Sequence, residues 1–138
     1  MLDEVIQHAI KNTLSYCSTS ENHPDGVDVE VMKFSELEEA YEKAVLISDR
    51  EHVTPYVKRK PSNAKQANRY FMEKDYSNIR FTVDEQSDFE AIKILIENLG
   101  SNARWFEYAD FITTNESLFS NQRIIRNEGY LISLEKDK

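Results

Sequence analysis

Polar side chains suited to ligand binding gather at two places in one continuous stretch of the sequence. The two groups are Asp25, Gly26, Asp28 and Glu30 within PDGVDVEV, and Arg50, Glu51 and His52 within DREHVTPY. Carboxylates, a guanidinium and an imidazole can each bind a polar small molecule, and the last two suit an anionic one. Farther along the chain, Asp84 ends an apolar run, and a carboxylate in such a place can bind Mg²⁺ through oxygen.

Each of these groups also has an interpretation that needs no ligand. Acidic residues on a strand beside a glycine turn, such as Asp28 and Glu30, are usually solvated. His52 fits a half-buried histidine at the start of a helix. Asp84 fits the N-cap of the helix that follows it, because an aspartate side chain accepts hydrogen bonds from the free amides there. The sequence patterns leave these alternatives open.

The composition narrows the class of protein. At 138 residues the chain is long enough to bury a core without disulfides, and we expect a single domain over residues 1–138. A net charge of −8 disfavours binding to nucleic acid. The one cysteine, Cys17, excludes a disulfide framework, and a free thiol fits a reducing compartment such as the cytoplasm. Because no apolar run approaches membrane-spanning length, we expect no membrane association.

Hydrophobic periodicity predicts the elements that position the first polar group. Apolar residues at helical spacing indicate a helix over residues 2–13, and a short strand can follow at Tyr16 and Cys17. From Val27 the period changes to two. One face of this predicted strand carries Val27, Val29 and Val31, and the other carries Asp28, Glu30 and Met32.

Two capping-box sequences predict helix starts around the second polar group. Ser35 and Glu38 open one helix, and Ser48 and Glu51 open another over residues 49–59. The predicted buried stripe of the first helix is Leu37, Ala40, Tyr41, Ala44 and Val45. Pro55 must lie near the start of the second helix, or that helix is bent there.

The second half of the chain reads as alternating strands, turns and helices. The predicted elements are a strand over 69–72, a turn at 75–78, a strand over 79–83, helices over 85–99 and 108–114, a turn at 127–129, and a final strand or docked tail over 130–134. The predicted apolar face of the longest helix is Phe89, Ile92, Leu95, Ile96 and Leu99, and Gly100 is predicted to end it as a left-handed cap. A strand, an aspartate and a helix start in succession form a common ligand-binding place in α/β folds, which is the fold class we predict.

Four segments carry a resemblance to a known family. PDGVDVEV, DREHVTPYV, FTVDEQSDFE and NEGYLISL resemble the C-terminal half of the cytidylyltransferase-like proteins of spore-coat polysaccharide biosynthesis. This family is similar to enzymes that activate acidic sugars, such as sialic acid and KDO, as CMP-sugars. The resemblance implies a partial three-layer, Rossmann-like nucleotide-diphospho-sugar transferase fold, with a short mixed sheet flanked by helices.

The resemblance also implies a function and ligands. It suggests part of an enzyme that makes a CMP-activated sugar from CTP and an acidic or amino sugar, with Mg²⁺ as cofactor. In the family the CTP-binding loop lies upstream, and these 138 residues contain no glycine-rich phosphate loop, so we expect the chain to be inactive alone. A non-catalytic, self-associating binding or assembly module is the alternative. Under either hypothesis we expect a homo-oligomer.

Carried over residue by residue, the resemblance implies roles for the same polar side chains. Asp84 stands where related enzymes carry a second acidic metal ligand, although DEQSD replaces their Asp-Thr-Pro-Glu-Asp pattern. The residues implied on the sugar side are Asp25, Gly26, Asp28, Glu30, Arg50, Glu51 and His52.

Overall fold

A computed structural model describes residues 1–125 and 128–138, without the side chains of Ala67 and Glu128. The chain forms two compact units, the first from residues 1–20, 29–71 and 128–138 and the second from residues 21–28 and 72–125. That the two behave as a single domain stays a prediction.

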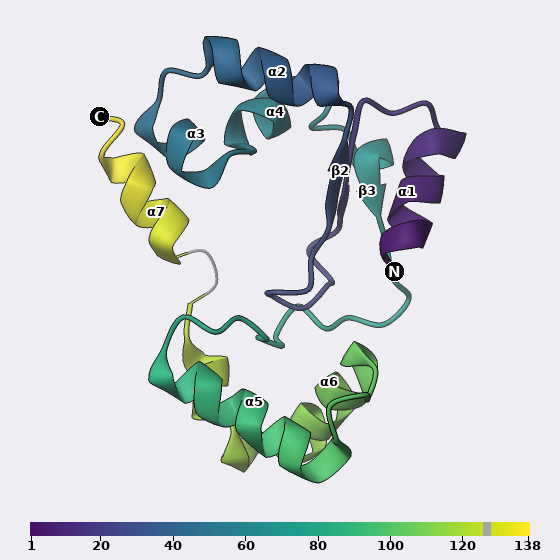
Figure 1. Cartoon of the computed structure of the whole chain (residues 1–138), viewed down its shortest axis with the longest axis vertical. Helices are drawn as coiled ribbons and strands as arrows, with labels where there is room; N and C mark the ends of the chain where they lie inside the picture. Colours follow the sequence, from purple (N-terminus) through teal and green to yellow (C-terminus); the bar gives the residue numbers. More distant parts are fainter. Residues whose placement is uncertain (126–127) are drawn as a thin grey trace. The chain divides into compact units, whose positions relative to one another are not determined.

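The first unit is built around a short mixed sheet (Figure 1). Its strands are β1 (Tyr16–Thr19), β2 (Glu30–Met32) and β3 (Arg69–Tyr70), in the order β2-β1-β3. β2 pairs antiparallel to β1, with Cys17 opposite Val31, and β3 pairs parallel to β1, with Ser18 opposite Arg69. The predicted strand over 69–72 is present but spans only Arg69–Tyr70.

Helices cover both faces of this sheet. The helices of the first unit are α1 (Leu2–Lys11), α2 (Phe34–Lys43), α3 (Ile47–His52), α4 (Pro55–Arg59), the 3₁₀ turn η1 (Gln66–Asn68) and α7 (Glu128–Glu135). On one face, α1 packs with Cys17, Val29 and Val31. On the other face, Tyr16 and Met32 pack with side chains of α2 and α4. This arrangement confirms the predicted α/β class, and it confirms the period-two pattern because Val29 and Val31 share a face.

Neither predicted capping box forms. The N-cap position of α2 is Lys33, so Ser35 lies inside the helix. The N-cap position of α3 is Leu46, and Ser48 also lies inside. The amide of Ser48 instead donates to the Asp137 carboxylate at 3.1 Å. A side chain 89 residues away in sequence therefore takes the place of the local cap.

The predicted helix over 49–59 is divided into α3 and α4. Val53 separates them with φ +65° and ψ −49°, and the Thr54 amide donates to the His52 carbonyl at 2.7 Å. Pro55 is the first residue of α4, where its missing N–H costs no hydrogen bond. Of the two predictions for Pro55, a position at a helix start is confirmed.

The end of the chain is helical rather than extended. Residues 130–134 lie in α7, so the predicted strand is wrong, while the predicted docking is confirmed because α7 packs on α3. The predicted turn at 127–129 begins outside the described residues, and Gly129 belongs to α7.

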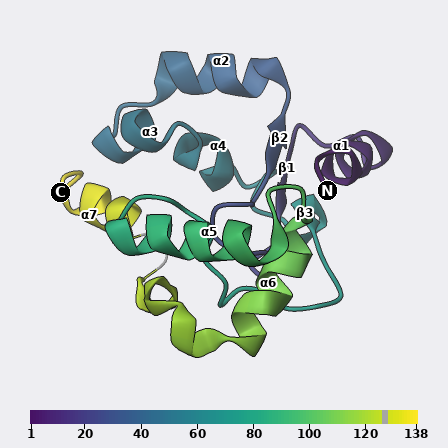
Figure 2. The same ribbon diagram turned by 60° about the horizontal axis from the view of Figure 1, so that its bottom comes forward.

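The second unit packs helices around a separate core. Its elements are α5 (Gln86–Leu99), α6 (Trp105–Thr114) and the 3₁₀ turns η2 (Glu116–Leu118) and η3 (Ser120–Arg123). In Figure 2, α6 begins near the C-terminal end of α5 and runs at an angle to it, and the two helices are in contact. The buried core residues are Tyr76, Ile79, Ala91, Leu95, Ala109, Ile112 and Phe119.

The predicted apolar face of α5 is only partly buried. Asp88, Ala91 and Leu95 face inward, whereas Phe89 and Ile96 are exposed. The ion pair of Asp88 with buried Arg80 accounts for this, because a charged carboxylate that must reach its partner inside the unit fixes the rotation of the helix.

The predicted strand over 79–83 reduces to a single parallel bridge between Asp25 and Arg80. The Asp25 amide donates to the Ile79 carbonyl at 2.8 Å, and the Phe81 amide donates to the Asp25 carbonyl at 2.7 Å. Gly26 then turns the chain with φ +91°, so the pairing cannot continue.

Candidate functional site

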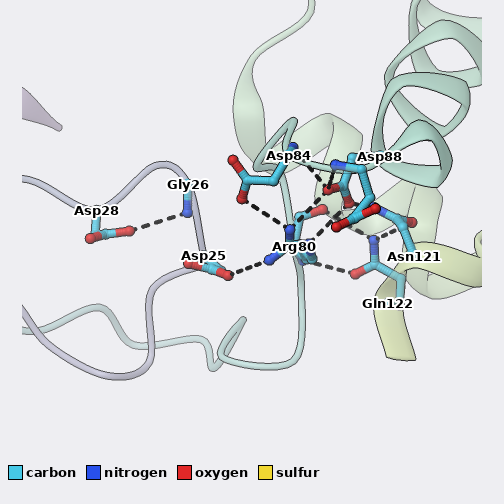
Figure 3. A network of polar contacts seen from close by, with 9 residues as sticks. Asp25, Gly26, Asp28, Arg80, Asp84, Asp88, Asn121 and Gln122 are labelled. Atoms are coloured by element: carbon cyan, nitrogen blue, oxygen red, sulfur yellow. Dashed lines mark hydrogen bonds and ion pairs between the residues drawn. The ribbon is translucent and has the colours of Figure 1, made fainter. Parts of the chain in front are cut away.

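Arg80 is the centre of a polar network in the second unit (Figure 3). Its side chain is 9% exposed and makes a bidentate ion pair with the fully buried Asp88, at 2.9 and 2.8 Å. It also donates to Asp25 and to Asp84, both at 3.2 Å. Figure 3 shows Arg80 between Asp25 on one side and Asp88 on the other.

Both oxygens of the Asp88 carboxylate accept hydrogen bonds from several neighbours. Besides Arg80, it accepts hydrogen bonds from the Asn121 side chain at 3.0 Å and from the amides of Asp84 and Glu85 at 3.1 Å. Led by the bond from Arg80, these bonds hold the pKa of Asp88 well below its usual range. The same pair raises the pKa of Arg80.

The helix that follows this network is capped differently from the prediction. The N-cap position of α5 is Glu85, so Asp84 is not the N-cap and that alternative is wrong. Asp88 satisfies the Glu85 amide from inside the first turn. Asp84 precedes the cap, with a side chain 71% exposed that contacts Arg80.

A glycine turn brings the first predicted group to this network. A Cβ on Gly26 would lie 2.7 Å from the Thr82 nitrogen and 2.9 Å from the Phe81 carbonyl carbon, so only glycine allows so close an approach. The Gly26 amide donates to the Asp28 carboxylate at 3.2 Å. The second unit thus brings Asp25, Gly26 and Asp28 together with Asp84.

Three carboxylates of this network could in principle supply oxygen ligands to Mg²⁺. A guanidinium already occupies the point where the carboxylates of Asp25, Asp84 and Asp88 converge. The part of the chain that the structure describes contains no group of three or more histidine, cysteine or acidic side chains that could hold a metal ion. These residues therefore do not form a Mg²⁺ site by themselves, and Asp84 as a ligand stays a prediction that requires further ligands.

The remaining predicted residues lie in the first unit and do not converge. Glu30 on β2 forms an ion pair with Lys58. Arg50 lies over the Tyr41 ring, 5.6 Å from its centroid. A Glu51 carboxylate oxygen lies 3.7 Å from the Lys136 ammonium nitrogen, and both side chains of this ion pair are exposed.

His52 lines a pocket of about 290 Å³ in the first unit. The lining residues are His52, Thr54, Pro55, Lys58, Arg59 and Tyr130. The rings of His52 and Tyr130 meet edge to face with centroids 5.2 Å apart. Arg59 makes a bidentate pair with buried Asp49, with both bonds at 2.7 Å, and this pair raises the pKa of Arg59.

A second pocket, of about 490 Å³, lies in the second unit and adjoins the Arg80 network through Gln122. The Gln122 side chain accepts from the Arg80 amide at 2.8 Å and donates to the Arg80 carbonyl at 3.1 Å. These bonds fix one wall of the pocket.

Sequence reasoning missed Arg80, Asn121 and Gln122. A signal for Arg80 was present, because a charged residue between Ile79 and Phe81 in an apolar run must find a partner if the run is buried. No local pattern marks the other two, because the residues that connect them to this network, Asp88 and Arg80, lie more than thirty residues away in sequence. The sequence analysis predicted His52 as a site residue. It did not predict that Lys58, Arg59 and Tyr130 line the same pocket.

Comparison with known proteins defines the class. The chain has a cytidylyltransferase-like fold: it superposes on a cytidylyltransferase from Leptospira borgpetersenii serovar Hardjo-bovis with a TM-score of 0.73 and 26% identity, over 90% of this chain and 54% of that one. It is also 29% identical over 134 residues to the uncharacterized protein MJ1063 of Methanocaldococcus jannaschii, covering 94% of this chain and 54% of that protein. The chain therefore spans about half the length of the proteins it matches. No family profile matches it.

Among the described residues, no helix is long and apolar enough to cross a membrane.

Proposed function

We propose that the chain is the sugar-side half of a nucleotidyltransferase that makes a CMP-activated sugar for surface or spore-coat polysaccharide. The observation that carries the proposal is the similarity to a cytidylyltransferase over 90% of the chain. The resemblance of DREHVTPYV and FTVDEQSDFE to the spore-coat family supports the choice of CMP-sugar synthesis.

The proposal gives the two polar regions separate tasks. Arg80 donates to Asp25, and Gly26 lies against the backbone of Phe81 and Thr82; a turn held at two points in this way can position a polar substrate. His52 and its neighbours would contact the sugar. Mg²⁺ stays part of the proposal for the intact enzyme, with Asp84 as the candidate ligand from this chain.

The test compares the chain alone with the chain joined to the reading frame that precedes it in its genome. Pyrophosphate release from CTP would be measured with sialic acid, KDO and neutral sugars as acceptors. We expect release with an acidic sugar from the joined protein and none from the chain alone, because the 138 residues contain no phosphate-binding loop. Turnover by the chain alone, or none by the joined protein, would contradict the proposal.

The second candidate is a self-associating module, and an exposed apolar surface favours it. On and just after α2, Phe34, Tyr41 and Val45 are 75%, 75% and 88% exposed, although periodicity predicted Tyr41 and Val45 to be buried. Apolar residues gathered on a surface often mark protein interfaces. Sedimentation velocity over a range of concentrations tests this: we expect association that weakens in a Tyr41→Ser, Val45→Ser variant, and a concentration-independent monomer would exclude the module.

A further inference from the structure

The pocket of about 490 Å³ in the second unit takes no part in the proposed function. Its lining residues come from the segment before Arg80, the C-terminal end of α6 and the 3₁₀ turns η2 and η3. All of them belong to one compact unit. A pocket of this volume is large enough to hold a small organic molecule.

The inner wall of this pocket is apolar. It is lined by Ile79, Ile112 and Phe119, which belong to the core of the unit and are each at most 3% exposed. Because core packing fixes these side chains, a ligand need not order them when it binds. Such a wall suits an aliphatic or aromatic group better than a group rich in hydroxyls.

Two polar side chains of the pocket have no hydrogen left for a ligand. The Gln122 amide group donates to the Arg80 carbonyl at 3.1 Å and to the Asn121 side chain at 3.0 Å. The Thr113 hydroxyl donates to the Ala109 carbonyl at 2.9 Å. These bonds hold both side chains in place, so the selection of a ligand falls to the other polar residues of the pocket.

Two opposite charges at the pocket are uncommitted. Arg123 and Glu116 both line it, and neither forms an ion pair or a side-chain hydrogen bond among the residues that the structure describes. In contrast, Arg80 and Arg104 of the same unit each pair with a carboxylate. A guanidinium can bind the carboxylate of a ligand, and a carboxylate can bind an ammonium group.

The presence of both charges narrows the class of ligand. Glu116 would repel a ligand whose charges are all negative, such as a nucleotide or a sugar acid, and Arg123 would repel a ligand that is only cationic. A zwitterion avoids both repulsions. The apolar inner wall adds the requirement for an apolar body, and together these features describe a ligand with a carboxylate, an ammonium group and a large apolar group.

We propose that this pocket binds a free α-amino acid with a large apolar side chain. Arg123 binds its carboxylate, Glu116 binds its ammonium group, and its side chain lies against Ile112 and Phe119. The proposal goes beyond the proposed function, because the transfer of CMP to a sugar involves no amino acid. It holds whether or not the chain takes part in that reaction.

The experiment is an NMR titration of the ¹⁵N-labelled full chain with four probes. Phenylalanine carries all three groups, 3-phenylpropionate lacks the ammonium group, phenethylamine lacks the carboxylate, and glycine lacks the apolar side chain. We expect saturable shifts of the amide signals of residues 112–123 with phenylalanine, and binding weaker by about tenfold or more for the other three. The Arg80 amide should also shift, because it donates to Gln122 at the pocket wall.

Three results of this titration would overturn the proposal. They are no saturable shift with phenylalanine, shifts confined to residues outside the pocket, and equal affinity for phenylalanine and any one of the truncated probes. The last result would show that the missing group is not bound.

Two variants identify which group each charged side chain binds. Arg123→Gln should weaken phenylalanine binding by about tenfold, while phenethylamine, which has no carboxylate, should bind equally or more tightly. Glu116→Gln should also weaken phenylalanine binding, while 3-phenylpropionate, which has no ammonium group, should bind equally or more tightly. Unchanged phenylalanine affinity in both variants would show that the two charges do not form the site.

A control in the same unit separates specific binding from general charge attraction. Arg104→Gln removes an arginine that is 69% exposed and does not line the pocket, so it should bind phenylalanine as the parent does. Because Arg123 and Glu116 are exposed, we expect both pocket variants to melt within about a degree or two of the parent. An equal loss of affinity in Arg104→Gln and Arg123→Gln would show nonspecific attraction and overturn the site.

Discussion

Arg80 carries a buried positive charge that three carboxylates surround, and their exposure differs sharply. Asp88 is fully buried, whereas Asp84 is 71% exposed. A buried charge that loses its partner is costly, but an exposed ion pair contributes little because water screens it. Comparing substitutions of these two aspartates therefore measures how much the buried and the exposed ion pair of Arg80 each contribute to the free energy of unfolding.

We expect Asp88→Asn to destabilise the protein by about 3–5 kcal/mol, because it leaves the Arg80 guanidinium buried without its main counter-charge. Asp84→Asn should cost less than about 1 kcal/mol. Chemical denaturation of both variants against the parent gives the comparison. Equal small losses would show that the Arg80–Asp88 pair does not stabilise the fold.

Asp84→Asn also separates a structural role from a metal role. In the protein joined to its nucleotide-binding half, a metal ligand replaced by a neutral amide should lower Mg²⁺-dependent activity by a large factor while the melting temperature stays unchanged. Full activity in that variant would remove Asp84 from the metal site.

The depressed pKa of Asp88 predicts how stability changes with pH. Unfolded aspartate has a pKa of about 3.9, and hydrogen bonds from Arg80 place the folded value below it. The contribution of the pair is therefore fully present above this pH and is lost as the pH falls toward the folded value. The difference in unfolding free energy between the parent and Asp88→Asn should be constant from about pH 7 to 5 and shrink below about pH 4. A difference that grows in acid would contradict the assignment.

At the scale of elements, the turn at Gly26 is held by close backbone contact. Gly26→Ala should cost more than Gly100→Ala, because both residues have positive φ but only Gly26 has atoms within 3 Å of a new Cβ. We expect about 1 kcal/mol from the backbone conformation at Gly100 and a further loss at Gly26 from displacement of the turn. Thermal denaturation measures both, and equal losses would mean that the turn moves without cost.

The capping of α3 by the C-terminal segment gives a second test at this scale. Asp137→Ala should lose about 1 kcal/mol, whereas Asp137→Asn should lose little, because asparagine caps about as well as aspartate. Hydrogen exchange of the α7 amides should quicken in the alanine variant. Unchanged exchange would show that this contact does not hold α7 on α3.

At the scale of the whole molecule, the two compact units raise the question of cooperativity. The chain passes from one unit to the other after Ser20, Asp28 and Phe71 and again between residues 125 and 128, so neither unit is a continuous segment. We expect one calorimetric transition, lowered alike by Asp88→Asn in the second unit and Asp137→Ala in the first. Two separate transitions would contradict the predicted single domain.

Features that depend on residues close together along the chain could be predicted from the sequence. The alternation from Val29 to Met32 set the two faces of β2, with Val31 toward α1 and Met32 toward α2 and α4. Gly100 ended α5 at the predicted position, although with φ +77° and ψ +168° it does not adopt the predicted left-handed helical conformation, and Pro55 began α4. Side-chain period, proline and glycine act through local sterics, so their effects can be read along the chain.

Features that depend on partners distant in sequence could not be predicted and became clear only from the folded chain. The rotation of α5 followed from the pair of Asp88 with Arg80 rather than from its apolar pattern. The start of α3 followed from Asp137, a partner 89 residues away, rather than from its own capping box. The pocket at His52 required Tyr130 from α7. A buried charge or a free helix amide must be satisfied, but the sequence does not say by which residue, since several can do so and only packing selects one.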